Sequence, residues 1–347
     1  MAKIIKIIEG DSYKRFYPLT LNHASFEIRV GNKTLLDLIL QDIEDLELVE
    51  LVVRDELADI IKERFPNFRV NSRLTESDNL KEYTDLKVSD YIDRVFPGTS
   101  NLFSFVGGKG IEVFSEDAFD SSVPDVITIN NTSIVISKTA IIRPGCIIDA
   151  SEGPVIVDDD ALLDIGCLIK GPSYIGKGTT VNPGAKLKDV AIGPYCKVGG
   201  EIEHSTFLGY SNKQHDGYIG HSYIGEWVNL GANTNNSDLK NNYSSVRVKI
   251  FDEEIDTGEL FIGCLIGDYT KTAISTMINT GTYIGMGCNI FGEGFHEKYI
   301  PNFRWGRNTI TEFDKFINTL SIVKSRRDKK LSSSEKKLIK KINKNKN

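Results

Sequence analysis

The chain has 347 residues, which is enough sequence for two globular domains. Hydrophobic residues make up 40% of it, and its formal net charge is -6. No run of about 18 apolar residues occurs, so we expect no membrane-spanning helix and no membrane partner. The five cysteines are scattered, odd in number and without a Cys-x-x-Cys pair, which argues against a disulfide framework and predicts a cytoplasmic protein.

The first part of the chain alternates strand and helix patterns. Residues 3–8 and 46–53 are β-branched and apolar over the length of a strand, whereas 35–43 and 56–65 carry apolar residues at helical spacing. This alternation predicts an α/β domain with a parallel sheet and crossover helices. We place this domain at residues 1–120.

From about residue 125 the apolar pattern repeats every six residues. The repeat positions are Ile136, Ile142, Ile148, Val157, Leu163, Ile169, Ile175, Val181 and Leu187, and later Ile278, Ile284 and Ile290. A period of six fits neither an amphipathic helix nor a simple strand, and it is the hexapeptide signature of a parallel β-helix, here left-handed. We therefore expect a left-handed parallel β-helix over residues 125–306, with the aliphatic side chains inside a triangular prism.

Two stretches interrupt the repeat, and a helical segment follows it. Residues 210–218 and 233–256 are too polar and irregular for the coil, so we expect them to form loops that carry function. Thr309-x-x-Glu312 has the form of a capping box, which predicts C-terminal helices in a third segment, 309–347. From Lys324 onward this segment has eleven Lys and Arg against two Asp and Glu, but no aromatic residues interleave them, so we do not expect nucleic acid as a partner.

The motif that indicates a function begins in the first interruption and ends in the second. It reads His215-x-x-Tyr218-x-Gly220-x-x-x-Ile224-Gly225-x-x-x-Asn229-x-Gly231-Ala232-x-Thr234, followed by Asn242-Tyr243. It resembles the acetyltransferase half of the bifunctional glucosamine-1-phosphate N-acetyltransferase / N-acetylglucosamine-1-phosphate uridylyltransferase family. The segments 209–213, 267–272 and 300–306 resemble a branch of sugar nucleotidyltransferases that carry a C-terminal left-handed β-helix.

The resemblance implies a role for each matching residue. His215 would be the general base, and Asn242 would orient it or stabilise the oxyanion. Tyr218 and Asn229 would bind the sugar, and Arg247, or alternatively Lys249, its phosphate. Acetyl-CoA would be the co-substrate, bound by Ala232, the coil around Cys264, and Lys271. Such sites are completed between packed prisms, so the resemblance also implies a homotrimer.

The chain departs from the family pattern where the family binds phosphate. Asn182 stands where the family has an Arg, and Glu203 and His204 stand near its paired Lys residues. Either Lys213, Arg247, Lys249 and Lys271 replace these cations, or the acceptor is a nucleotide-linked amino sugar.

The N-terminal domain resembles a nucleotidyltransferase only in part. Arg15-x-x-Pro18-Leu19-Thr20 is similar to the end of that signature, and Arg29 recurs in the branch, which makes both arginines candidates for nucleotide binding. The preceding Gly-x-Gly-Thr is missing, and no carboxylate for Mg²⁺ stands out. A degenerate domain is therefore the favoured interpretation, and Mg²⁺ is expected only if nucleotidyl transfer is retained.

The function predicted from the sequence is acetyl transfer from acetyl-CoA to an amino sugar phosphate or a nucleotide-linked amino sugar. One alternative is a Mg²⁺-dependent sugar-1-phosphate nucleotidyltransferase that uses UTP or dTTP, with the β-helix for trimerisation and regulation. The other is a non-catalytic scaffold. A zinc site at His204, His215 and His221 is not favoured, because no carboxylate is evident as a second shell. Trp227 is expected to pack at a subunit interface.

Overall fold

The computed structural model describes residues 3–43, 48–72, 82–95, 107–108, 111, 125–250 and 253–344. The chain divides into two compact units. Unit 1 comprises Met1–Ile28, Lys33–Ser104 and Phe313–Lys346, and unit 2 comprises Arg29–Asn32, Phe105–Glu312 and Asn347. The C-terminal helices therefore cluster with the N-terminal domain, whereas residues 309–312 belong to unit 2.

Unit 1 contains the predicted α/β fold. Its parallel sheet has the strand order β5–β4–β1–β6, from β1 (Lys3–Ile8), β4 (Leu48–Val52), β5 (Arg69–Val70) and β6 (Glu82–Lys87). The helices are α1 (Leu35–Gln41), α2 (Ala58–Arg64) and α3 (Val88–Val95), and the short strand β3 (Lys33–Thr34) precedes α1. Thr34 and Asp37 form a capping box that starts α1. The β-branched residues of β1 and β4 supply the buried centre of this sheet.

The basic C-terminal segment forms two helices of unit 1, α4 (Phe313–Ser325) and α5 (Ser333–Lys344). A buried ion pair joins them, with Lys324 Nζ 2.6 Å from Glu335 Oε1. Lys337 and Lys341 of α5 lie 3.3 and 3.7 Å from the carboxylates of Asp59 and Glu56 beside α2. Part of the positive charge of this segment is thus neutralised within unit 1.

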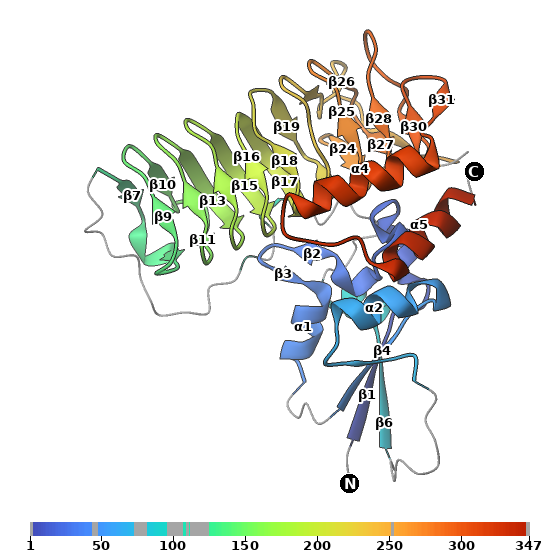
Figure 1. Ribbon diagram of the computed structural model, residues 1–347. Helices are drawn as coiled ribbons and strands as arrows, with labels where there is room; N and C mark the ends of the chain where they lie inside the picture. Colours follow the sequence, from blue (N-terminus) through green and yellow to red (C-terminus); the bar gives the residue numbers. More distant parts are fainter. Residues whose placement is uncertain are drawn as a thin grey trace. The chain divides into compact units, whose positions relative to one another are not determined.

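Unit 2 is the predicted left-handed parallel β-helix, whose coils stack side by side (Figure 1). Its first side contains β7 (Ile127–Ile129), β10 (Ile147–Asp149), the starts of β13 (Leu168–Ile175), β15 (Lys186–Ile192) and β17 (Glu201–Gly209), then β19 (Tyr218–Gly220), β21 (Asn235–Asn236) and β26 (Met277–Ile278). The third side contains β8 (Ile134–Ile136), β11 (Val155–Val157), the ends of β13, β15 and β17, then β20 (Tyr223–Glu226), β24 (Cys264–Ile266), β27 (Thr282–Ile284) and β29 (Tyr299–Ile300).

The second side contains β9 (Ile141–Ile142), β12 (Leu162–Leu163), β14 (Thr180–Val181), β16 (Lys197–Val198), β18 (Asn212–Lys213), β25 (Lys271–Thr272), β28 (Asn289–Ile290) and β30 (Arg304–Trp305). Antiparallel β31 (Thr309–Ile310) closes it, and β2 (Arg29–Val30) also belongs to unit 2. The strands pair in register, so residues one coil apart form columns. Leu163, Val181 and Val198 form one inward column, and each is fully buried. This in-register stacking of aliphatic residues builds the core.

The regular ladder is interrupted between β19 and β21. The Asn235 carboxamide oxygen accepts a hydrogen bond from the backbone N–H of Tyr218 at 2.8 Å. The Asn236 carboxamide both accepts from the Gly220 N–H and donates to the Gly220 carbonyl, at 2.8 and 3.0 Å. Side chains thus replace the backbone ladder at this point. The chain then leaves the prism to form the antiparallel hairpin of β22 (Arg247–Ile250) and β23 (Glu253–Asp256).

Candidate active site

His215 lies at an exposed turn between the second and first sides of the prism, which we call the His215 corner (turns 199–200, 215–216, 232–233 and 274–275). It follows β18 by two residues, so the coil places it at the prism edge. Its imidazole makes no hydrogen bond to any residue within the described part of the chain. The imidazole is therefore open to a substrate that approaches this corner.

Because the coils pair in register, Asn229 and Lys271 stack on Asn212, three residues before His215 on the second side, and Ala232 stacks at the His215 corner. Asn229 forms parallel bridges with Asn212 on one side and Lys271 on the other, and its carboxamide oxygen accepts a hydrogen bond from Asn212 at 3.3 Å. Ala232 lies one coil beyond His215 at the same corner, where the Asn233 N–H donates to the Asp216 carbonyl at 2.8 Å. Burial lowers the pKa of the Lys271 ammonium. The second side thus presents two amides and a partly buried cation in one row, at the strand positions that precede the His215 corner.

Tyr218 points away from His215. Its hydroxyl donates to Asp238 Oδ2 at 2.8 Å, at the opposite corner between the first and third sides. The same oxygen lies 2.8 Å from Nδ1 of His221. Gly220 makes room for this cluster, since a Cβ there would collide with the Tyr218 hydroxyl and the Asp238 carboxylate. We call Tyr218, His221 and Asp238 the Asp238 cluster.

Hydrogen bonds within the Asp238 cluster favour an ionised Asp238 and a neutral Tyr218. Burial alone would raise the pKa of Asp238, but hydrogen bonds from His221 and Tyr218 hold it below its ordinary value. Burial, and then the hydrogen bond to Asp238, raise the pKa of Tyr218 well above its usual range. Tyr218 therefore remains a protonated donor, and Asp238 remains an anion.

A second histidine–carboxylate pair stacks on this cluster. His204 Nδ1 lies 2.7 Å from Asp189 Oδ2, and the rings of His204 and His221 stack at 4.5 Å with an interplanar angle of 21°. The sequence did not indicate these carboxylates, because they approach from neighbouring coils. Because the rings of His204 and His221 are nearly parallel, the lone pairs of their nitrogens lie side by side and do not converge on one ion. His215 lies outside this stack. The structure therefore does not assemble the three histidines as ligands of a single zinc ion.

Asn242 does not contact His215. It lies exposed in a turn, and its carboxamide oxygen accepts hydrogen bonds from the backbone N–H and the hydroxyl of Ser244, at 3.2 and 3.0 Å. The carboxamide thus stabilises its own turn, as asparagine commonly does. The prediction that Asn242 orients His215 has no support in this geometry, because Asn242 lies in the segment that leaves the prism after β21.

Arg247 and Lys249, the predicted phosphate ligands, are exposed on β22. Arg247 faces the partner strand, with Nε 3.6 Å from Asp256 Oδ2 and Nη1 4.0 Å from Glu254 Oε1. Lys249 stands opposite Glu254 in the hairpin register. Because these pairs are exposed, they are weak and could exchange for a phosphate.

The side chains of two predicted site residues, Cys264 and Lys213, point into the prism. Cys264 is fully buried, its sulfur lies 3.4 Å from Ser222 Oγ, and burial raises the pKa of its thiol to about 12. The Cys264 thiol therefore does not face a cofactor on the surface of the prism. Lys213 occupies the inward column after Val198 and is 1% exposed. It therefore cannot replace a phosphate-binding cation on the surface.

Of the two candidate nucleotide-binding arginines, Arg15 is paired with a carboxylate, whereas the guanidinium of Arg29 has two buried nitrogens, Nε and Nη1, without a hydrogen-bond partner among the described residues. Arg15 Nη1 donates to Asp93 Oδ1 of α3 at 2.7 Å. Arg29 is buried in unit 2, where its guanidinium lies 5.4 Å from the centre of the Tyr174 ring. The Tyr223 hydroxyl accepts a hydrogen bond from the backbone N–H of Arg29 and donates one to its backbone carbonyl, each at 2.9 Å. Arg29 is thus packed against the third side of the prism.

The carboxyl end of the unit 1 sheet is occupied by the chain itself. Glu9 directly follows β1 and is buried, and its carboxylate accepts from the Ser25 N–H at 3.0 Å and from Arg54 Nε at 3.2 Å. Burial raises the pKa of Glu9, an effect that the positive charge of Arg54 opposes. Nucleotide phosphates normally bind at this edge of a parallel sheet. Here a carboxylate and its arginine fill it.

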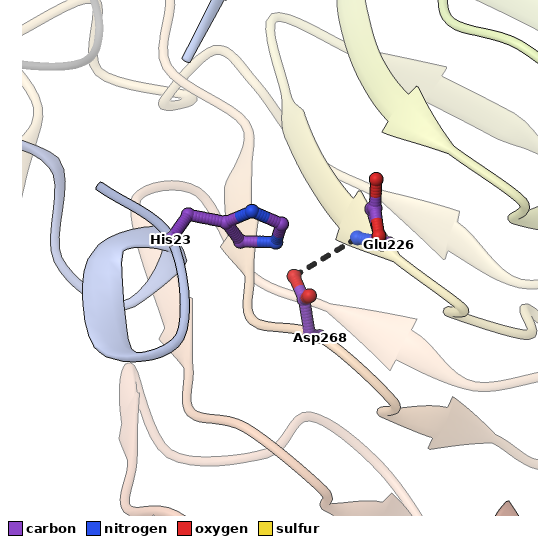
Figure 2. A group of neighbouring side chains, drawn as sticks. All are labelled: His23, Glu226 and Asp268. Carbon is purple, nitrogen blue, oxygen red and sulfur yellow. Dashed lines mark hydrogen bonds between the residues drawn. The ribbon is translucent and has the colours of Figure 1, made fainter. Parts of the chain in front are cut away.

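Two segments that mark the resemblance have structural roles. Tyr210 stacks between Tyr195 and Trp227, with ring centroids 5.1 and 4.5 Å apart. Trp227 is 5% exposed, so the expectation that it packs at a subunit interface is wrong. Asp268 is buried and accepts a hydrogen bond from the Glu226 N–H at 2.9 Å (Figure 2), which fixes the end of β20.

Comparison with known proteins gives relatives of one kind. No family model matches the chain. A Sulfurisphaera tokodaii protein named bifunctional sugar-1-phosphate nucleotidylyltransferase/acetyltransferase is 34% identical over 143 residues, which are 40% of this chain and 36% of that protein. The bifunctional protein GlmU of Clostridium botulinum is 28% identical over 178 residues, 47% of this chain and 36% of that protein. Each match thus spans little more than a third of the relative's length.

Among solved structures, the UDP-N-acetylglucosamine acyltransferase of Francisella novicida matches 64% of this chain and 78% of its own, with 16% identity and a TM-score of 0.43.

In the described part of the chain, no helix is long and apolar enough to cross a membrane. The curated relatives carry the names of the family that the His215 motif resembles, which confirms that resemblance at modest sequence identity.

Proposed function

We propose that the protein transfers an acetyl group from acetyl-CoA to the amine of an amino sugar phosphate or a nucleotide-linked amino sugar. The observation that carries this proposal is the His215 motif on a β-helix, with an open imidazole at a prism corner and with Asn229 and Lys271 on the second side of the prism, in register with Asn212. The names of the curated relatives support the same class of reaction.

The reaction needs a base. An amino sugar is largely protonated near neutral pH, and an ammonium has no lone pair with which to attack a thioester. In the proposed step the His215 imidazole takes one proton from the ammonium, and the resulting amine attacks the acetyl carbon. The carbon–sulfur bond then breaks as the second nitrogen proton passes to the sulfur, which releases CoA as its thiol. A histidine suits this role because its ordinary pKa of about 6.5 leaves a neutral imidazole at pH 7–8.

The surrounding residues support a polar acceptor and a CoA chain. The amides of Asn212 and Asn229 would hydrogen-bond sugar hydroxyls, and the Lys271 ammonium would contact an anionic group of either substrate. The small side chain of Ala232 leaves space at the His215 corner for the pantetheine arm. Arg247 or Lys249 on the hairpin would bind a phosphate of the acceptor.

We propose that the protein acts as a homotrimer. Ile274 lies one coil beyond Ala232 at the His215 corner and is 74% exposed, and Ile165 at the same edge is 59% exposed. A second prism would cover such side chains and complete the site. Light scattering on the purified protein tests this: a trimer mass is expected, and a monomer would contradict it.

For unit 1 we propose that nucleotidyl transfer has been lost. The Glu9–Arg54 pair fills the sheet edge where a triphosphate would bind, and a buried carboxylate would repel phosphate there. Calorimetric titration of the whole protein with UTP or dTTP in Mg²⁺ is expected to show no binding. Tight, Mg²⁺-dependent binding would instead favour a nucleotidyltransferase.

The experiment that tests the main proposal is a screen of amino sugar phosphates and nucleotide-linked amino sugars with acetyl-CoA, read by release of the free CoA thiol. We expect one acceptor class to release CoA, and His215→Ala to reduce the rate on the order of 10²-fold or more. His221→Ala is the matched histidine variant from the opposite corner. An unchanged rate in His215→Ala removes His215 as the base, and no CoA release with any acceptor would favour a non-catalytic scaffold.

A further inference from the structure

Lys213 is an unusual residue for its position in the fold. It pairs in register with Val198 on the second side, and the column that these residues continue is aliphatic at Leu163 and Val181. The repeat therefore calls for an aliphatic residue, yet the chain places a lysine that is 1% exposed inside the prism. Burial lowers the pKa of its ammonium to about 8, an effect that the Asp216 carboxylate opposes. A buried cation is costly for a core unless its hydrogen bonds are satisfied, so the contacts of this ammonium indicate what the lysine does.

The Lys213 ammonium bonds to the corner that carries His215. Its Nζ donates to the His215 carbonyl at 2.6 Å and to the Gly199 carbonyl at 3.0 Å. Gly200 leaves the space for this contact, since a Cβ there would lie 2.8 Å from both Lys213 Nζ and the His215 carbonyl oxygen. The ammonium thus links the turn at 199–200 to the turn at 215–216.

Asn182 holds the backbone on the N-terminal side of His215. It comes from the coil before Val198, and its carboxamide Nδ2 donates to the Gln214 carbonyl at 2.8 Å. The Gln214 carbonyl belongs to the peptide group that precedes the His215 Cα, and the His215 carbonyl belongs to the one that follows it. Two side chains therefore fix the two peptide groups on either side of His215.

We propose that Lys213 and Asn182 are positioning residues that hold the His215 backbone in place from inside the prism. This inference rests on the proposed role of His215 as base. Neither side chain touches a reacting atom. Both restrict where the imidazole of an otherwise exposed turn can lie, and displacement of a base by about 1 Å can cost on the order of 10²-fold in rate. The position occupied by a phosphate-binding arginine in the resembled family would thus serve base positioning in this chain.

The kinetic test compares Lys213→Met, Lys213→Gln and Asn182→Ala in the full chain, with Lys186→Met as the control for loss of a lysine from an outward strand position. Methionine fills the aliphatic column but cannot donate, so we expect kcat to fall about tenfold or more. The KM for acetyl-CoA should change less than about threefold, and the thermal midpoint should not fall. Glutamine keeps an N–H donor and should restore part of kcat. Unchanged kcat in Lys213→Met, or equal kcat in the methionine and glutamine variants, would overturn the inference.

A second readout does not depend on activity. Hydrogen–deuterium exchange, followed by mass spectrometry of the peptide that covers residues 214–217, should be faster in Lys213→Met and in Asn182→Ala than in the wild type. Peptides from the regular coils at 136–187 should exchange as before in Lys213→Met. Unchanged exchange at 214–217 would refute the positioning role even if no acceptor were found. Loss of CoA release in His215→Ala together with full activity in Lys213→Met would refute the positioning role alone.

Discussion

Lys213 makes the stability of the prism depend on pH in a direction that can be calculated. Its pKa is about 8 in the folded chain, because burial disfavours the charged form, against 10.5 for an exposed lysine. Between these two values the unfolded chain binds more protons than the folded chain. The free energy of unfolding therefore rises as the pH increases through this window. The full difference, at about 1.4 kcal/mol for each pKa unit, is about 3 kcal/mol, of which about 2–3 kcal/mol develops between pH 7 and 10.

The assay is urea unfolding of the wild type and Lys213→Met at pH 7 and at pH 10. The protein has two tryptophans, Trp227 and Trp305, and both lie in unit 2, so tryptophan fluorescence reports on the prism. Tyrosines and other lysines titrate in both proteins, so the difference between the two isolates Lys213. We expect the wild type to gain about 2–3 kcal/mol relative to the variant on going from pH 7 to pH 10. Equal changes in both proteins, or a loss in the wild type, would refute the argument that Lys213 is a buried cation.

Two further substitutions test other parts of the structure. Asp238→Asn removes the charge to which Tyr218 and His221 donate, so we expect about 1.5–3 kcal/mol less stability at pH 7 by thermal denaturation. Because the pKa of Asp238 is lowered on folding, this difference should shrink as the pH falls through the carboxylate range, and a difference that persists in acid would contradict it. In unit 1, Lys324→Met leaves Glu335 buried without its partner and should cost about 3–5 kcal/mol. Adding Glu335→Leu should recover most of that loss, and a single variant as stable as the wild type would show that the pair is not coupled.

The period of six predicted the prism well, because in a β-helix the inward position is a local property of each strand. Val181 and Val198 point inward because their coils pair in register, and aliphatic residues at that spacing can bury themselves in no other simple way. The α/β pattern of unit 1 was equally local. The placement of α4 and α5 with unit 1 was not predictable, because it depends on contacts such as Lys337 with Asp59 that are remote in sequence.

The site was harder to predict, because its hydrogen bonds join different coils. Asp238 reaches Tyr218 and His221 only after the chain has passed β19 and β21, and nothing in the local sequence distinguishes it from other loop aspartates. Lys213 was taken for a surface cation although it follows Val198 in the inward column. If the six-residue repeat is counted through the interruption at 210–218, Lys213 falls at an inward position. It takes the place that Val198 has one coil earlier.

The central claim is that the chain acetylates the amine of a sugar, with His215 taking the proton. The most direct measurement is mass spectrometry of the acceptor after incubation with acetyl-CoA and either the wild-type protein or His215→Ala. We predict that the wild type adds one acetyl group to the amino sugar nitrogen and releases an equal amount of CoA, whereas His215→Ala forms little product at neutral pH and recovers in part at high pH, where the free amine needs no base. Equal product formation by both proteins at neutral pH would contradict the account.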